Sequence, residues 1–364
     1  MTFHARTACM AGCLGLFGLL GPFAQAQTAA NGVTVYGIAD LGVRQASGLT
    51  PGNAPSPGSN SLVGSGIDTT SRLGFRGRED LGAGLAALFN LESGLNLNDG
   101  TSINRNKWFD RAAFLGLSGK AGTLTLGRQT TLLGDSLGRI DPLGFRFAPF
   151  NPNVALAGLS AHGLGQEYGP AGSANGSFRL DNTLKYSLKT GAYEWRALRA
   201  QGQRQSDAPS QAGATELGLF YDTPELNGSL SLSQFKTAEG LSLKAASAGL
   251  GLAAWGGRWS ASYARHIAQT STTQETRRDI LSFGGVLPLS AQLDLVMALY
   301  HVKRQQTGLA NDGFNRAVGF LEYKLSRRSL VYAELDQTQW QGTAHLPGTR
   351  RSATGVSLGI KQVF

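Results

Sequence analysis

Apolar and polar residues alternate along most of this chain. Residues 33–44, VTVYGIADLGVR, carry mainly apolar side chains at one parity and polar ones at the other, with Ile38 as the exception. Because successive side chains of a β-strand point to opposite faces, the alternation predicts strands with one apolar and one polar face. The pattern predicts sixteen strands of 8–12 residues, at 33–44, 71–79, 84–93, 109–118, 121–129, 179–188, 192–201, 214–221, 227–236, 243–253, 257–266, 276–286, 291–302, 313–323, 328–337 and 354–364.

The lengths of these strands and of their connections indicate the fold class. A tilted strand needs ~9–11 residues to cross a bilayer, which the predicted strands match. Short connections rich in Gly, Pro, Asn and Asp alternate with long ones, of which 130–178 is the longest. Bacterial membrane barrels have an even number of strands, short periplasmic turns and long external loops. The sequence therefore predicts an all-β fold, a transmembrane antiparallel β-barrel of about sixteen strands.

Both ends of the chain carry features of an exported protein. A basic residue, the apolar run LGLFGLL at 14–20 and AQA at 24–26 follow one another in the order of a secretory signal peptide. We expect residues 1–26 to be removed and residues 27–364 to form the barrel in the outer membrane. The last predicted strand ends on Phe364. A terminal aromatic residue on an amphipathic strand looks like the signal for outer-membrane assembly.

Composition excludes several other classes of protein. Glycine accounts for 50 of 364 residues, and the mean hydropathy is −0.13. Cys9 and Cys13 lie in the predicted signal peptide, so no disulfide or thiolate site is expected in the mature chain. The sequence has no P-loop, HExxH or GxSxG motif, and the remaining histidines lack ligand spacing. We therefore expect no enzymatic activity, no cofactor and no metal site. The net charge of +9 does not indicate a nucleic-acid partner, because the chain is exported.

The segment SRLGFRGRED places three arginines on one face of a predicted strand. Arg72, Arg76 and Arg78 share a parity, and Leu73 and Phe75 lie on the opposite one. A solvated or snorkelling side chain is the alternative explanation for any single arginine. A charge that faces hydrocarbon in a barrel costs ~2–4 kcal/mol at the membrane midplane. We therefore predict that this basic face borders the lumen.

Several segments together resemble the Gram-negative general porins, particularly their β-proteobacterial branch. The match is strong from 33 to 188, and beyond Ser187 only the strand rhythm agrees. The resemblance implies a homotrimer of sixteen-stranded barrels whose third external loop, here 130–178, folds into the lumen. The segments that carry it are VTVYGIADLGV, SRLGFRGREDLGAGLAALFNLESG, FDRAAFLGLSGKAGTLTLGRQ, RLDNTLKYS and the terminal phenylalanine.

The resemblance also implies a pore constriction. Its wall arginines would be Arg72, Arg111 and Arg179, and its loop acid would be Asp141. Alternation does not settle the direction of Arg111, because apolar residues share its parity. The family's second acid is absent, since Phe145 stands there. The remaining loop charges are Arg139 and Arg146 near the ring, and Asp135, which either anchors the loop or touches solute.

These features predict a general diffusion porin that passes ions and small hydrophilic solutes passively. Two charges ~4 Å apart interact by about 4 kcal/mol at an effective dielectric constant of ~20, against about 1 kcal/mol in bulk water. The excess of arginine at the constriction therefore predicts a moderate anion preference. Expected partners are two further copies of the chain, outer-membrane lipid and lipopolysaccharide, the assembly machinery, and small solutes including anions. The alternatives are a substrate-specific channel for phosphate or organic acids, a lipid-acting enzyme, and an adhesin or structural barrel without a channel.

Overall fold

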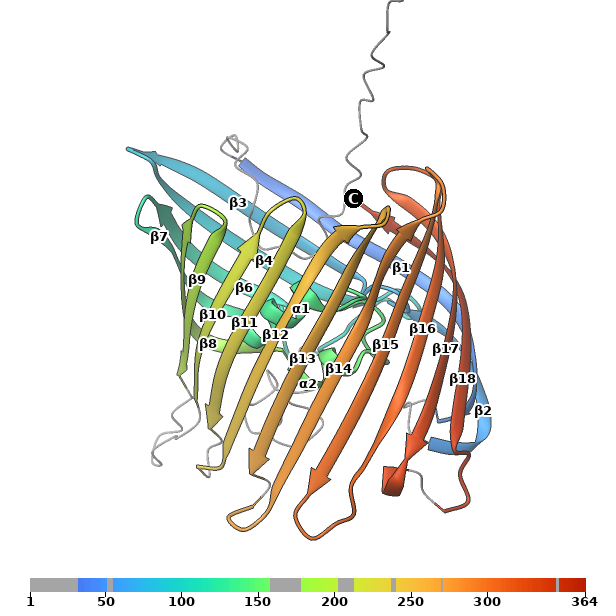
Figure 1. Ribbon diagram of the computed structural model, residues 1–364. Helices are drawn as coiled ribbons and strands as arrows, with labels where there is room; N and C mark the ends of the chain where they lie inside the picture. The colour runs from blue at the N-terminus through green and yellow to red at the C-terminus, as the bar shows by residue number, and fades with distance from the viewer. Residues whose placement is uncertain are drawn as a thin grey trace, which may run out of the picture.

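The strands of the protein form one closed antiparallel barrel (Figure 1). The computed structural model describes residues 32–50, 55–157, 178–201, 213–236, 240–269, 271–344 and 347–364. The predicted signal peptide, 1–26, lies outside the described residues. The wall strands are β1 (Gly32–Leu49), β3 (Arg72–Gly82), β4 (Leu85–Asn96), β6 (Ala112–Gly119), β7 (Gly122–Thr130), β8 (Arg179–Thr190), β9 (Tyr193–Gln201), β10 (Gly213–Asp222), β11 (Leu226–Lys236), β12 (Ser242–Ala254), β13 (Gly257–Gln269), β14 (Glu275–Pro288), β15 (Leu293–Gln306), β16 (Asp312–Lys324), β17 (Ser329–Gln341) and β18 (Ser352–Val363).

The first and last wall strands pair with each other and close the barrel. Ile38 in β1 lies opposite Val363 in β18, and the pairing continues to Ser47 opposite Thr354. Phe364 extends this ladder, because its N–H donates to the carbonyl oxygen of Gly37 at 3.1 Å and its own carbonyl accepts from the Gly37 N–H at 3.0 Å. The predicted barrel and its sixteen wall strands are thereby confirmed. The role of Phe364 in assembly stays a prediction.

Two strands were not predicted from the sequence. They are β2 (Pro55–Ser65) and β5 (Thr101–Ser102), and both lie within long connections of the wall. Strand β2 folds back on β1, with Ser65 opposite Leu41 and Pro55 opposite Leu49. Its sequence, PSPGSNSLVGS, lacks alternation and is dominated by residues that favour turns, so periodicity could not reveal it.

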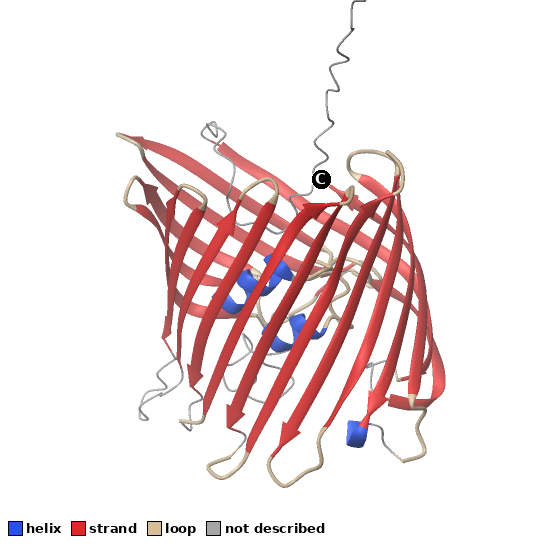
Figure 2. Ribbon diagram, in the orientation of Figure 1, coloured by secondary structure: helices blue, strands red, loops and turns tan. Residues whose placement is uncertain are grey.

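Short and long connections occupy opposite ends of the barrel (Figure 2). The short turns lie at the end where the chain terminates, and the long connections lie at the other end. At two of the short turns both central residues have positive φ, namely Ala83 (52°) with Gly84 (79°) and Trp255 (52°) with Gly256 (74°). Positive φ at both positions is the requirement of a type I′ turn, whose twist matches that of the flanking strands.

The barrel exposes its large apolar side chains and turns polar ones inward. In β10, Leu217 is 59% exposed, whereas its neighbour Glu216 is 1% exposed. The same inversion recurs in β7, where Leu126 is exposed and Thr125 is buried. An outward apolar band with a polar interior is the pattern of a barrel in lipid. No helix in the described part of the chain is long and apolar enough to cross a membrane.

The described part of the third long connection, 131–157, folds into the barrel, as predicted. Its helix α1 (Leu132–Ile140) is followed by α2 (Pro152–Ala157), and both lie within the ring of strands (Figure 2). The Thr131 side chain caps α1 by accepting from the Gly134 N–H at 2.9 Å. The leucines of α1 and Ile140 are fully buried, and the helix contacts β10, β11 and β12. Packing of its apolar face therefore holds the loop against one side of the wall.

Candidate pore constriction

Two wall arginines pair with one carboxylate inside the barrel, and a third lies within its electrostatic reach. Arg72 begins β3, Arg179 begins β8, and Arg111 directly precedes β6. The Nε of Arg111 lies 2.6 Å from Oε1 of Glu92, and the Nε of Arg72 lies 3.8 Å from its Oε2. The positive charge of Arg179 also interacts electrostatically with the Glu92 carboxylate. The structure therefore brings together the three arginines that the sequence singled out.

Arg111 faces inward although the apolar residues that share its parity face outward. Leu115 in β6 is 64% exposed. The strand begins only at Ala112, and the chain bends at residues 110–111. Because the bend precedes the regular ladder, the parity of β6 does not apply to Arg111. This is why alternation alone left its direction open.

Glu92, which the sequence reasoning missed, is the acid of this cluster. Glu92 and Asn90 point to the same face of β4, and the alternate residues Phe89 and Leu91 point outward. The hydroxyl oxygen of Tyr36 lies 2.9 Å from Oε2 of Glu92 and 2.8 Å from Oδ1 of Asn90. The alternation within LAALFNLESG already marked Glu92 as inward-facing, so this signal was available in the sequence.

The ring of Phe178 supports the third arginine. The Arg179 guanidinium carbon lies 4.2 Å from the Phe178 ring centroid, and Arg179 is 5% exposed. Arg72 and Arg111 are each 7% exposed. A guanidinium stacked on an aromatic face keeps its in-plane donors available for a carboxylate or another anion. The cluster can therefore bind a second anionic group besides Glu92.

Asp141 does not face the arginine cluster as expected, because its carboxylate is engaged within the loop and with Tyr300. It is 4% exposed, and its Oδ2 accepts from Asn151 Nδ2 at 2.7 Å and from the Phe145 N–H at 3.0 Å. Its Oδ1 accepts from Asn153 Nδ2 at 2.9 Å and from the Tyr300 hydroxyl at 3.0 Å. Burial raises the pKa of Asp141. The side chain thus organises the turn that follows α1, and the arginine cluster lies against Glu92 instead.

Asp135 anchors the loop to the wall, which is one of the two roles expected for it. Its Oδ2 lies 2.9 Å from Lys185 Nζ on β8 and 2.8 Å from Arg196 Nη1 on β9. Burial by itself raises the pKa of Asp135, but the neighbouring charges of Lys185 and Arg196 outweigh it and lower that pKa. These ion pairs fix α1 to the wall.

The other two loop charges are also engaged with the wall. Arg139 Nη1 lies 3.4 Å from Asp222 Oδ2, and burial lowers the pKa of Arg139. Arg146 Nη1 lies 3.2 Å from Asp68 Oδ1 and forms a second ion pair with Glu322. Each of these arginines therefore has an acidic partner, unlike the cluster of three around Glu92.

Arg76 and Arg78 continue the basic face of β3 toward the short-turn end. Both are exposed. The guanidinium of Arg76 lies 5.1 Å from the ring centroid of Tyr36, which also contacts Glu92. Arg128 in β7 is 5% exposed and donates to the Asp110 carbonyl oxygen at 2.6 Å. It also pairs with Asp181 at 2.8 Å, so its guanidinium is engaged inside one subunit.

A polar barrel with an inward helix and a basic wall matches a known family. The family model described as Gram-negative porin matches residues 15–343. The chain belongs to the Gram-negative porin family. Together with its closed barrel, this makes it a porin of the outer membrane. Among the described residues of the porin, no group of three or more His, Cys, Asp or Glu side chains could hold a metal ion.

Several known proteins are similar to this porin. An outer membrane porin protein of Bordetella pertussis is 32% identical over 60% of this chain and 58% of its own length. Outer membrane porin protein 32 of Delftia acidovorans is 26% identical over 93% of this chain and 96% of its own length. Among solved structures, an anion-selective porin from Comamonas acidovorans superposes with a TM-score of 0.72 at 23% identity, covering 92% of this chain and 100% of that one.

Strand β1 and the second half of the porin supply a clamp for the loop that the sequence did not predict. Arg44 Nη1 lies 2.9 Å from Glu334 Oε2, and Arg44 Nη2 lies 2.6 Å from Asp336 Oδ2. The Arg44 guanidinium stacks on the loop residue Phe150, with 4.2 Å between its carbon and the ring centroid. Arg316 Nη1 donates to the Phe150 carbonyl oxygen at 2.5 Å. Arg44 in β1 and Arg316 in β16 therefore hold the loop at Phe150, on the side of the barrel away from α1.

Proposed function

We propose that this porin is a passive diffusion channel whose anion preference is set by the arginines around Glu92. The observation that carries the proposal is the charge of this cluster. Arg72, Arg111 and Arg179 contribute three positive charges and Glu92 one negative charge, so the net charge is 3 − 1 = +2. Basic rings that line a pore favour anions.

The loop charges do not cancel this excess. Asp141 is turned into the loop, Asp135 is held by Lys185 and Arg196, and Arg146 is held by Asp68 and Glu322. Charges on the outer rims are screened by salt within about 8–10 Å. The unbalanced cluster inside the barrel is therefore expected to dominate the selectivity. The anion-selective porin of similar fold supports the same sign.

This arrangement predicts which solutes cross the pore most readily. Small anions and uncharged hydrophilic solutes cross by diffusion through water, between the arginine wall and the inward loop. No step of this transport requires catalysis or a cofactor, and we propose none. Cations cross more slowly, because they meet the positive cluster.

The assembled state that we propose is a homotrimer in the outer membrane. Its outward apolar band, which includes the exposed Leu115, Leu117, Leu124 and Leu126 in β6 and β7, has to be covered by lipid or by another subunit. A solved outer membrane protein of Vibrio cholerae with a similar fold is described in a trimer form, at 14% identity and a TM-score of 0.66. We further propose that residues 1–26 direct export and that Phe364 is recognised by the assembly machinery. Outer-membrane lipid and lipopolysaccharide then surround the outward faces.

Single-channel recording in a planar bilayer tests the proposed function. We expect an ohmic conductance and, across a salt gradient, a reversal potential of anionic sign. A chain that inserts and gives no conductance would contradict the channel proposal and favour an adhesin or structural barrel. A conductance that saturates with phosphate or an organic acid would instead indicate a substrate-specific anion channel.

A further inference from the structure

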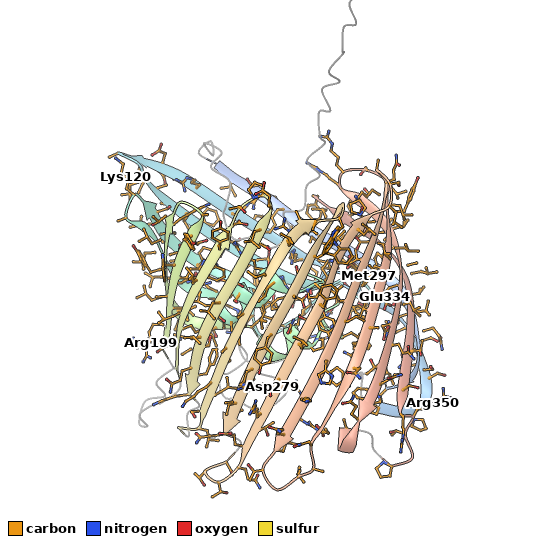
Figure 3. The ribbon with its side chains drawn as sticks, in the orientation of Figure 1. Lys120, Arg199, Asp279, Met297, Glu334 and Arg350 are labelled. Carbon is orange, nitrogen blue, oxygen red and sulfur yellow. The ribbon has the colours of Figure 1, made fainter. Side chains whose placement is uncertain are left out.

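The outer face of the barrel carries a belt of charge between its apolar band and its long connections. In β12, the outward residues Leu250 and Leu252 are 58% and 44% exposed, and the same parity leads to the exposed Lys244. In β13, the outward face that carries Tyr263 continues to Arg265. Asp279, which pairs with Arg265 in register, lies toward the long-connection end in Figure 3. The charged belt is therefore at the external side of the membrane band.

A groove opens on this face between β10 and β13. Its volume is about 380 Å³, and Leu217, Leu232 and Ile267 form its apolar lining. Ala246 lies opposite Leu232 on one side and Arg265 on the other. A methyl side chain between two long ones accounts for the hollow. Lys244 and Arg265 border the same groove, so its apolar lining and two positively charged side chains occur together.

Of the two cations, Arg265 is held in place by an acidic residue, Asp279, which also binds Arg277. Asp279 Oδ1 lies 2.7 Å from Arg265 Nε, and Asp279 Oδ2 lies 2.9 Å from Arg277 Nε. The Tyr263 hydroxyl donates to Oδ1 of Asp279 at 2.5 Å. Because each arginine uses its Nε for Asp279, its two terminal nitrogens stay chemically able to donate to another acceptor. Asp279 thus orients two guanidinium groups without neutralising both.

Basic groups outnumber acidic ones around the groove. The outward positions of β9 to β15 near it carry six basic residues, and the outward acids of the same strands are Asp279 and Glu275. Arg199 extends the basic set to β9, where its Nη1 donates at 2.5 Å to Oγ1 of Thr215, a residue of the groove lining. The basic residues are Arg199, Lys236, Lys244, Arg265, Arg277 and Lys303.

We propose that this groove binds a phosphate-bearing lipid of the outer leaflet, with an acyl chain along Leu217, Leu232 and Ala246 and a phosphate on Lys244 and Arg265. Guanidinium and ammonium groups are the side chains that bind phosphate, and Leu217 and Leu232 are more than half exposed to the membrane. The same face of a second copy would place like charges against each other. This site rests on the lipid partnership proposed above and gives it a location, but it is independent of the pore.

Native mass spectrometry of the intact porin in neutral detergent tests this proposal. The probe is lipid A, a bisphosphorylated acylated disaccharide, compared with zwitterionic phosphatidylcholine and with inorganic phosphate. We expect one retained lipid A per subunit. The double variant Lys244→Gln/Arg265→Gln should weaken retention about tenfold, because it removes both phosphate contacts. Ala246→Phe should weaken it as well, by filling the groove without changing any charge.

A matched control separates the site from general electrostatics. Arg350→Gln removes a positive charge from an exposed position in the connection between β17 and β18 and should leave lipid A retention unchanged. All variants should keep the wild-type conductance, so a loss of conductance would concern the pore and not this site. Equal retention by the double variant and wild type would overturn the proposal. So would equal retention of phosphatidylcholine, retention of inorganic phosphate alone, or a change of subunit number in Ala246→Phe.

Discussion

At the scale of single residues, Glu92 decides the balance of charge at the candidate constriction. It is the carboxylate that contacts Arg111 and Arg72, and Arg179 lies within its electrostatic reach. The loop acid expected from the family pattern, Asp141, is buried elsewhere. Each wall arginine therefore depends on Glu92 for compensation, and the net charge changes by a full unit when Glu92 does.

Replacement of Glu92 should strengthen the anion preference. Glu92→Gln keeps the side-chain volume and raises the net charge of the cluster from +2 to 3 − 0 = +3. One further charge at ~4 Å in water-like surroundings contributes about 1 kcal/mol, or about fivefold in the anion-to-cation permeability ratio. The reversal potential in a salt gradient measures this ratio. A shift toward cations, or no shift, would place Glu92 away from the permeation path.

Asp141 should matter for the loop and not for the sign of selectivity. Asp141→Ala removes the buried acceptor that Asn151, Asn153 and Tyr300 share, and each group left unsatisfied costs ~1–3 kcal/mol. We expect a lower apparent midpoint of thermal unfolding and an unchanged sign of the reversal potential. Asp99→Ala, which removes a carboxylate exposed in a loop, is the matched control and should leave the midpoint unchanged. A cationic or strongly altered reversal potential in Asp141→Ala would restore Asp141 as a pore residue.

At the scale of elements, the inward loop is held from both sides. Helix α1 packs its leucines on β10 to β12 and pairs Asp135 with β8 and β9. The segment after it is clamped at Phe150 by Arg44 and Arg316. Ion pairs at both attachments imply that the position of the loop depends on ionised carboxylates.

The anchor at Asp135 should therefore weaken in acid. Its pKa in the folded protein lies below the ordinary value of ~3.9, so its contribution is fully present above about pH 4 and is lost as the pH falls through the lower folded pKa. Comparison of wild type with Asp135→Asn by thermal unfolding from pH 7 to pH 2 measures this contribution. We expect the gap between their midpoints to be constant near neutrality and to close only below pH ~4. A gap that closes near pH 6, or persists at pH 2, would contradict the assignment.

The wall strands could be predicted from the sequence because each has one face in lipid and one in the polar interior. Alternation is then a direct consequence of the environment, as in β10, where Leu217 and Glu216 differ so strongly in exposure. Strand β2 escaped prediction because its sequence, rich in Pro, Gly and Ser, shows no alternation of apolar and polar residues. The arginines of the site were predicted from the basic face of β3 and from family resemblance.

The partners of those arginines could not be predicted as readily. Glu92 was accessible through the parity of β4 alone, but its pairing depends on the register between β3, β4 and the residue before β6. The clamp of Arg44, Glu334 and Asp336 joins residues nearly 300 positions apart, across the closure of the barrel. Contacts of this kind depend on which strand ends meet around the ring, which a local pattern does not contain.

At the scale of the whole molecule, closure of the barrel separates two electrostatic surfaces. The interior holds the arginine cluster and the ion pairs of the loop, and the outer face holds an apolar band with a basic belt at its external side. The two surfaces are carried by opposite parities of the same strands. Substitutions on one surface are therefore expected to leave the other unchanged.

The reversal potential of single channels in a salt gradient tests the central claim most directly. Wild type should give an anionic sign, and Arg72→Gln/Arg179→Gln should move the potential toward cations, since the cluster then falls from +2 to 1 − 1 = 0. Arg350→Gln removes charge from an exposed loop and should leave the potential unchanged. A cationic potential in wild type, or an unchanged potential in the double variant, would contradict the claim that these arginines set the selectivity of the pore.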